Sequence, residues 1–283
     1  MKNIVLYCDQ GMHELALNTI ASFNRVADDF VFHYFTIDFK PTVDQANCVV
    51  YPIEYILMPH PQFIKPYIFL EALKHINEFI YVDCDLIASK GFNYSDYVKD
   101  IQGGYPYCPR LHETAWQRPS YFWTHNNKRF SVNEDPMMEY LNVRHRTQPW
   151  VTTLMVGVNS TCTEFIQEWS DVLLTEKLWT PPAEFNTIPR GFKYYFSMVD
   201  ESVLNVLFWK SRITDYYRTG AVLEPKKLES FVELESNRVI NKRIEAENEL
   251  TDCLDSSKVY VYHQLKDLEF RNKIMETFLK LNI

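Results

Sequence analysis

Two aspartates separated by a single residue, Asp83 and Asp85, follow an apolar run in the segment FIYVDCDLIAS (79–89). One carboxylate at a strand end is ordinary, because a loop aspartate is solvated or bonds its own backbone. In an extended segment alternate side chains share a face, so we expect Asp83 and Asp85 to converge while Cys84 points away. Paired carboxylates suit a hard divalent cation such as Mg²⁺ or Mn²⁺. The segment therefore predicts a metal site at an exposed strand end.

Two further ionisable residues stand where strands are expected to end. Asp9 follows the apolar run NIVLYC (3–8), and His263 follows the run VYVY. An aspartate in this position is a common turn former, and a lone histidine after an apolar run is commonly a packed or surface residue. A ligand role is the alternative for each. As a third metal ligand, the imidazole of His263 would favour Mn²⁺ over Mg²⁺.

Charged residues also stand where helices are expected to begin. Lys65 precedes Pro66, and Asp200 and Glu201 open the segment SMVDESVLNVLFWK (197–210). A lysine near a helix start is either solvated or available to phosphate oxygens, to which it offers a compact positive charge. Acidic residues in a first turn interact favourably with the helix dipole, which is the simpler interpretation of Asp200 and Glu201. The other interpretation is that they belong to a functional site.

The elements before these residues alternate between strand and helix. Strands are predicted at 3–8, 31–38 and 79–85, and apolar spacing predicts helices at 13–26 and 63–77, the second with Pro66 in its first turn. This order predicts right-handed crossovers and a largely parallel sheet. Ligands of such sheets gather at the carboxyl ends of the strands, where both CDQ and DCD fall.

The second half of the chain is less regular. Residues 103–150 are rich in Tyr, Trp, Pro, His and Arg without a clear period, which indicates irregular structure or short strands and a binding surface. The tryptophans of this segment, Trp116, Trp123 and Trp150, either stack on a ligand or belong to the core. After this segment we expect strands at 151–160 and 258–266, helices at 163–174 and 197–210, and a charged helix at 224–250. The helix at 197–210 is expected to bury four apolar residues, Val203, Leu204, Leu207 and Phe208.

Composition narrows the class of protein. The 283 residues are 46% hydrophobic and 15% aromatic, enough for one sizeable α/β domain. A formal net charge of −8 argues against nucleic acid or an anionic membrane as the main partner. The six cysteines include no CxxC pair, which favours reduced thiols in the cytoplasm. We find no signal peptide pattern and no apolar stretch long enough for a membrane span.

Several common enzyme motifs are missing. The chain has only seven glycines, and none of them form GxGxxG or GxxxxGK[ST], so a Rossmann dinucleotide site and a P-loop are both disfavoured. Neither HELAL nor HETAW has the second histidine of a zinc protease, and no GxSxG elbow occurs.

Four segments, in order, resemble GT-A fold glycosyltransferases, especially the group containing glycogenin and the bacterial galactosyltransferases of lipopolysaccharide. They are YCDQGMHELALNTIASF, KPYIFLEALKHINEFIYVDCDLIAS, DESVLN and YHQLK. The resemblance implies one GT-A type, Rossmann-like α/β domain over 1–283, with a central, mostly parallel sheet flanked by helices. Residues 1–100 would form the nucleotide-sugar half, ending in the DxD motif, and residues 101–283 the acceptor-binding and metal-completing half.

The resemblance also implies roles for individual residues. It makes Asp83, Asp85 and His263 the ligands of Mn²⁺ or Mg²⁺, Glu201 and Asp200 the catalytic residues, and Tyr7, Asp9, Lys65, Asp83 and Lys266 the donor-binding residues. Three positions depart from the family pattern: Leu154 replaces a glycine, Glu201 replaces a glutamine, and the late histidine motif lacks its glycine. These departures leave both retaining and inverting transfer open, with retention favoured.

The function implied is metal-dependent transfer of a sugar from a nucleotide-diphosphate sugar, in particular a UDP-hexose, to a glycan, a lipid-linked sugar or a protein. The enzyme would act in the cytoplasm without nucleic acid or a membrane span. The alternative is a non-catalytic protein of the same fold that binds a nucleotide sugar or a glycan.

Overall fold

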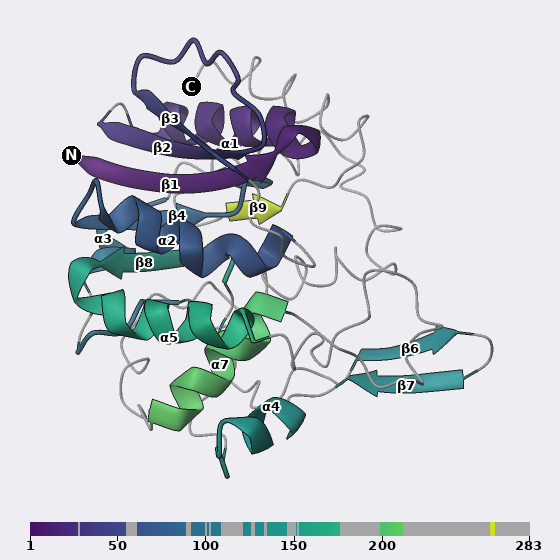
Figure 1. The fold of residues 1–283 in the computed structure, drawn as a ribbon. Helices are drawn as coiled ribbons and strands as arrows, with labels where there is room; N and C mark the ends of the chain where they lie inside the picture. Colours follow the sequence, from purple (N-terminus) through teal and green to yellow (C-terminus); the bar gives the residue numbers. More distant parts are fainter. Residues whose placement is uncertain are drawn as a thin grey trace.

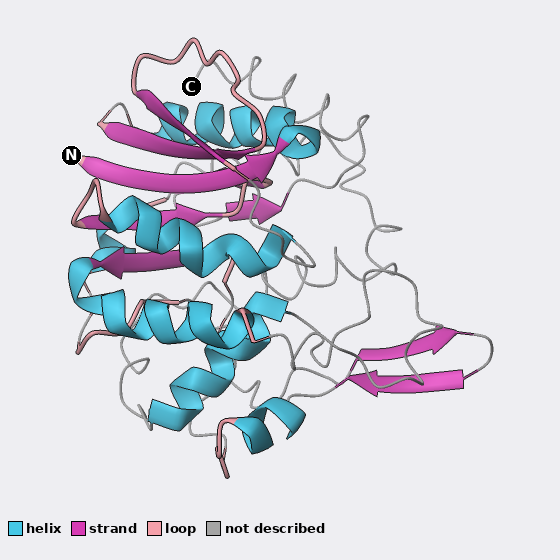
Figure 2. Ribbon diagram, viewed as in Figure 1, coloured by secondary structure: helices cyan, strands magenta, loops and turns pink. Residues whose placement is uncertain are grey.

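The computed structural model describes residues 1–27, 29–54, 61–88, 92–99, 101, 103–108, 121–125, 128–132, 135–145, 151, 153–175, 199–211 and 261–263. Figure 1 shows these segments as a central sheet with helices against its faces, and Figure 2 shows the same view coloured by secondary structure. The predicted α/β class is confirmed.

The central sheet has five strands in the order β3-β2-β1-β4-β8. They are β1 (Lys2–Asp9), β2 (Phe30–Ile37), β3 (Cys48–Ile53), β4 (Glu78–Val82) and β8 (Met155–Asn159). The first four are parallel to their neighbours, and β8 runs antiparallel to β4, so the predicted mostly parallel sheet is confirmed. The chain moves outward from β1 to β3 and then returns to β4 on the other side of β1. This reversal is the place where sheets of this kind bind ligands.

The central strands are buried on both faces, which explains their nearly continuous apolar sequences. Along β1, Ile4 and Leu6 belong to one core cluster, whereas Val5 and Tyr7 belong to the other. The first cluster includes Ala16, Ile20 and Phe23 from α1 (His13–Val26). The second includes residues of α2 (Lys65–Leu73), α5 (Thr163–Leu173) and α7 (Val199–Ser211). Figure 1 shows α2 and α5 lying across the same side of the sheet.

The helix predictions agree closely with the structure where apolar spacing is regular. Helix α1 has the predicted bounds, and α7 buries Val203, Leu204, Leu207 and Phe208 as expected. The helix predicted at 63–77 is shorter, because a 3₁₀ turn, η2 (Pro61–Ile64), precedes α2 and the chain turns after Leu73 toward β4. Pro66 lies in the first turn of α2, as predicted.

The strand predicted at 79–85 ends earlier than expected. Strand β4 stops at Val82, and Asp83 to Asp85 form a turn in which the N–H of Leu86 donates to the carbonyl of Asp83 at 3.3 Å. The extended geometry predicted for Asp83 and Asp85 is therefore wrong. A short strand follows, β5 (Leu86–Ala88), and pairs with β9 (Val261–His263).

The aromatic insertion contains short elements. Strands β6 (Tyr121–His125) and β7 (Lys128–Val132) form a two-stranded sheet and α4 (Asp135–Tyr140) follows. Between β5 and β6 lie α3 (Ser95–Val98) and Tyr107, which bridges to Gly157 in β8. A Cβ on Gly157 would lie 2.1 Å from the carbonyl oxygen of Tyr97, so this close packing requires glycine.

Some predictions fall outside the described residues: Lys266, Trp116, Trp150 and the charged helix at 224–250. The strand predicted at 258–266 is described only as β9. None of the described helices is both long and apolar enough to cross a membrane.

Candidate active site at the carboxyl edge of the sheet

The first helical residue of α2, Lys65, lies at the centre of a buried polar network. Helix α2 connects the carboxyl end of β3 with the start of β4, so its N-terminus lies at the carboxyl edge of the sheet. The ammonium of Lys65 is 2.7 Å from Asp200 Oδ2 and 3.1 Å from Asp83 Oδ1. Only 3% of Lys65 is exposed. The structure thus joins the starts of α2 and α7 to the turn after β4 through one cation.

Thr153, just before β8, links the same network to both acidic residues of α7. Its hydroxyl donates to Asp200 Oδ2 at 2.9 Å, and its backbone N–H donates to Glu201 Oε2 at 3.2 Å. Lys65 Nζ in turn donates to the hydroxyl and carbonyl oxygens of Thr153 at 3.2 and 3.3 Å. A single residue therefore orients two carboxylates and one ammonium group.

The carboxylate of Asp83 is held between Lys65 and Tyr81. The hydroxyl of Tyr81 donates to Asp83 Oδ1 at 2.5 Å, the oxygen that also faces Lys65. Burial raises the pKa of Asp83 to about 6, with Asp85 adding to the rise and Lys65 opposing it. Burial also acts to lower the pKa of Lys65, but the carboxylates of Asp200 and Asp83 raise it well above its usual value. Lys65 is therefore charged at neutral pH.

Two tyrosines form the apolar floor of this network. Tyr7 in β1 and Tyr81 in β4 stack with ring centroids 5.8 Å apart, and the ammonium of Lys65 lies 5.0 Å from the centroid of the Tyr81 ring. A cation over an aromatic face gains favourable electrostatic energy, particularly when water is excluded. Tyr7 is 7% exposed, and burial raises the pKa of its hydroxyl well above the usual value. Its predicted role in donor binding stays a prediction.

The turn that carries Asp83 and Asp85 is fixed from both sides. The N–H of Asp83 donates to the carbonyl of Leu154 at 2.9 Å, and the hydroxyl of Thr19 in α1 donates to the carbonyl of Cys84 at 2.8 Å. Asp85 is only 8% exposed and the side chain of Asp83 22%. The predicted exposed strand end is therefore wrong, because α1 and β8 pack on both sides of the turn.

The predicted metal ligands lie on neighbouring segments. Leu86, the residue after Asp85, pairs with His263 across the β5–β9 ladder, so the backbone of His263 lies beside the acidic turn. Among the side chains that the structure describes, which do not include that of His263, no group of three His, Cys, Asp or Glu residues is placed to hold a metal. The oxygen donors of Asp83 and Asp85 fit a hard cation, which would also relieve the repulsion between the two carboxylates.

Asp9 acts as the turn former that the sequence suggested. Its Oδ1 accepts the N–H of Met12 at 3.1 Å and caps the 3₁₀ turn η1 (Gln10–Met12). It also ends β1, next to the point where the strand order reverses. Its predicted role in donor binding stays a prediction.

Helix α7 is anchored so that its first turn faces the network. The indole N–H of Trp169 in α5 donates to the carbonyl of Asp200 at 3.1 Å. The amide of Asn205 donates to the carbonyls of Val151 and Glu201, both at 2.8 Å, and accepts the N–H of Val151 at 2.9 Å. Asp200 and Glu201 are 3% and 4% exposed, so they are buried polar residues with specific partners rather than solvated dipole charges.

Sequence reasoning missed Thr153, Tyr81 and Trp169. The signal for Thr153 was present, since it lies in the strand segment TTLMVGVNS that departs from the family pattern. Tyr81 sits two residues before Asp83, and so on the same face in an extended strand. Trp169 carries no local signal, because its indole is recruited from a helix 31 residues away from Asp200.

Comparison with known proteins supports the fold. No family model matches the sequence, and no curated protein is detectably similar to it. A structure of the galactosyltransferase LgtC, in complex with donor and acceptor sugar analogues, is 10% identical, with 99% of this chain and 96% of that chain aligned and a TM-score of 0.50. An LgtC active-site mutant, with glutamate in place of a glutamine, is 9% identical over 98% of this chain and 95% of that chain, with a TM-score of 0.51. The predicted resemblance to GT-A glycosyltransferases is confirmed for the fold.

Proposed function

We propose that this protein is a glycosyltransferase that moves a sugar from a nucleotide-diphosphate sugar to a hydroxyl acceptor. The observation that carries the proposal is the buried network of Lys65, Asp83, Thr153, Asp200 and Glu201 at the carboxyl edge of the sheet. A buried network of this kind is costly unless every member is satisfied, and strongly perturbed carboxylates are typical of functional sites. The fold, which is that of LgtC, supports the same conclusion.

We propose that Asp83, Asp85 and His263 hold a divalent cation, Mn²⁺ or Mg²⁺. The support is the pair of carboxylates in one turn and the position of the His263 backbone beside it. When bound, the cation would neutralise the negative charge that develops on the diphosphate leaving group. Asp83 Oδ1 contacts Lys65 and Tyr81, so we assign the other oxygen of this carboxylate, Oδ2, to the cation.

The remaining donor contacts follow from the same edge. We propose that Lys65 sets the orientation of Asp83 and Asp200 and contributes positive charge to the phosphate side, with Lys266 as a second phosphate partner. Tyr7 and Asp9 would contact the nucleoside, since β1 ends beside the crevice where the strand order reverses. The donor is proposed to be UDP-linked, and the acceptor a glycan, lipid-linked sugar or protein.

Glu201 is the stronger candidate for the carboxylate that reacts. The carboxylate of Asp200 is neutralised by its ion pair with Lys65, and the carboxylate of Glu201 is oriented by the backbone N–H of Thr153. A carboxylate beneath the anomeric carbon stabilises positive charge or attacks as a nucleophile in retaining transfer, and acts as general base in inverting transfer. We propose retention. The anomeric configuration of the product, determined by NMR, tests this choice.

The test of the proposed function is hydrolysis of a panel of nucleotide-diphosphate sugars with and without Mn²⁺. Asp85→Asn should lower the Mn²⁺-dependent rate by about 100-fold or more, because it removes a carboxylate ligand of the cation that would neutralise the leaving group. Asp29→Asn is the control, since Asp29 is exposed and pairs only with surface Lys2 among the contacts known for it. Donor binding without turnover would identify a binding protein of this fold instead. Equal hydrolysis by both variants would overturn the assignment.

We also propose that the enzyme works in the cytoplasm. The five cysteines within the described residues, Cys8, Cys48, Cys84, Cys108 and Cys162, are free thiols. Burial raises the pKa of Cys8 to about 12, so this thiol stays protonated and unreactive beside the proposed donor site.

A further inference from the structure

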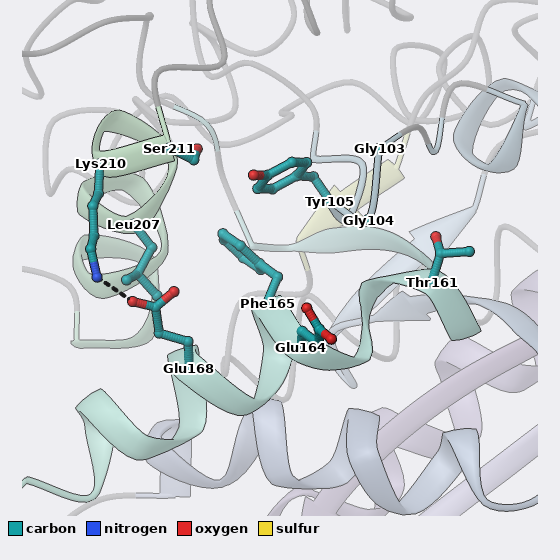
Figure 3. A pocket seen from close by; sticks show the side chains of 10 residues that line it. All are labelled: Gly103, Gly104, Tyr105, Thr161, Glu164, Phe165, Glu168, Leu207, Lys210 and Ser211. Atoms are coloured by element: carbon teal, nitrogen blue, oxygen red, sulfur yellow. Dashed lines mark hydrogen bonds and ion pairs between the residues drawn. The ribbon is translucent and has the colours of Figure 1, made fainter.

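A cavity of about 360 Å³ lies away from the acidic network, at the other end of α7. It is formed by a turn before Tyr107, the start of α5 and the end of α7. Its lining includes Gly104, Tyr105, Thr161, Glu164, Glu168 and Lys210. Figure 3 shows these side chains around one hollow. The volume falls within the range of small-molecule sites.

The topology separates this cavity from the proposed donor site. Strand β8 is antiparallel to β4, so Asn159 pairs with Glu78 at the amino edge of the sheet, and Thr161 follows at once. Helix α7 begins with Asp200 in the acidic network and ends with Lys210 and Ser211 in the cavity wall. Ten residues of α-helix span about 15 Å. The two sites therefore lie at opposite ends of one helix.

One wall of the cavity is aromatic. The rings of Tyr105 and Phe165 meet edge to face with centroids 5.4 Å apart, and Phe165 stacks on Phe208 at 5.0 Å. Phe165 and Phe208 are buried, so they fix the position of the half-buried Tyr105. The turn before Tyr105 needs its glycines, since Gly103 and Gly104 have φ of +61° and +83°. Tyr105 is thus a supported aromatic surface facing the cavity (Figure 3).

The remaining wall of the cavity is polar and nearly balanced in charge, and it flanks the aromatic rings on two sides (Figure 3). Lys210 is paired with Glu168 at 2.5 Å, and both side chains remain close to half exposed. Glu164, one turn earlier on α5, is exposed, and the hydroxyls of Thr161 and Ser211 lie at the rim. Figure 3 shows the ion pair on one side and Thr161 on the other. This wall offers both donors and acceptors of hydrogen bonds.

The lining selects one class of ligand. Two glutamates disfavour phosphate and other anions, and Lys210 already neutralises one of them, which weakens the site for a cation. The charged wall disfavours a purely apolar ligand, which would leave those groups without water. A neutral ring with hydroxyls on its edge and C–H groups on its face matches both walls. We propose that this cavity binds a sugar ring of an oligosaccharide.

The proposal does not depend on the reaction at the acidic network. A glycan held at this cavity would be bound whether or not the carboxyl edge transfers sugar, and binding is measured without a nucleotide sugar.

The test is saturation-transfer NMR and calorimetry of the full chain with maltotriose, cellotriose, lactose and tri-N-acetylchitotriose. Tyr105→Ala should weaken the binding of the sugar that binds best by at least about tenfold, because it removes the aromatic face against which the sugar ring would pack. Tyr140→Ala is the matched control, since Tyr140 is 48% exposed on α4 and does not line the cavity. Glu164→Gln, which keeps the side-chain shape, should weaken binding several-fold, with Glu54→Gln as its exposed control.

Hydrolysis of nucleotide sugars by the same variants should stay within about twofold of wild type, because the cavity is about 15 Å from Asp200 along α7. Binding of none of the four sugars to the wild type would overturn the proposal. So would binding that survives both Tyr105→Ala and Glu164→Gln, and Glu164→Gln keeps the test decisive if Tyr105→Ala does not fold.

Discussion

Helix α7 takes part in an ion pair at each end, and the two pairs differ in burial and in their further partners. At its start Asp200 meets Lys65 at 2.7 Å, and each side chain is 4% exposed. At its end Lys210 meets Glu168 at 2.5 Å, and the side chains are 45% and 43% exposed. The first pair is shared with Asp83 and Thr153, whereas the second lies in the wall of an open cavity.

The comparison shows how burial determines what a charge pair does. Water screens the exposed pair, so its attraction is weak and its groups are available to exchange partners with a ligand. Removing the inner pair from water costs several kcal/mol per ion, which the structure offsets with a hydrogen bond from Lys65 to the hydroxyl of Thr153 and another from that hydroxyl to Asp200. A network of this kind fixes the geometry of its members. If one member is removed, the remaining charges stay buried without compensation, which destabilises the fold.

The largest effect is therefore expected from Lys65→Met. This variant leaves Asp83 and Asp200 buried without their shared cation, and loss of one partner of a buried pair costs about 3–5 kcal/mol. Urea unfolding monitored by circular dichroism measures the change. Lys74→Met is the control in the same stretch of chain, because Lys74 forms its ion pair with Glu71 while 63% exposed. Equal losses in both variants would show that burial does not distinguish these lysines.

The next effect concerns the dependence of stability on pH in metal-free protein. The pKa of Asp83 is raised from 3.8 to about 6 in the folded state, chiefly by burial, so the folded protein binds this proton more tightly than the unfolded chain does. Its contribution is fully present below pH 4 and is lost as the pH rises through about 6. The shift corresponds to a decrease in the free energy of unfolding on the order of 3 kcal/mol across this pH range.

Comparison with Asp83→Asn isolates this contribution, because asparagine does not titrate. The stability of the wild type relative to the variant should fall between pH 4 and pH 7, as measured by urea unfolding in the presence of a chelator. A difference that stays constant or rises across this window would mean that Lys65 outweighs burial at Asp83.

The elements of the fold were predictable where local patterns decide them. Helix α1 and the buried residues of α7 follow apolar spacing, and the carboxyl ends of β1 and β4 meet because parallel neighbours share an edge. The end of β4 was not predictable. Apolar residues continue on both sides of DCD, but the ladder with β8 stops at Val82, whose partner is Met155, and only the register shows this.

The burial of the site was equally invisible to local reasoning. Lys65 stands at a helix start where solvation is the simpler expectation, and the groups that enclose it come from Thr153 and Asp200, 88 and 135 residues further along the chain. For the cavity at the other end of α7, the sequence indicated a binding surface only in the segment that starts at Gly103. Tyr105, Glu164 and Lys210 are ordinary surface types, and only the packing of the turn at 103–105, α5 and α7 brings them together.

The smallest effect is expected from Lys210→Met. The pair with Glu168 is nearly half exposed, and pairs of this kind contribute about 0–1 kcal/mol, with less at high salt. Urea unfolding at low and high ionic strength should therefore place this variant within about 1 kcal/mol of the wild type. The reverse-charge variant Lys210→Glu adds a third carboxylate to the cavity wall and should lose more stability at low salt than at high salt. A loss from Lys210→Met as large as that from Lys65→Met would remove the distinction between the two ends of α7, and with it the reason to regard the outer pair as free to exchange partners with a sugar.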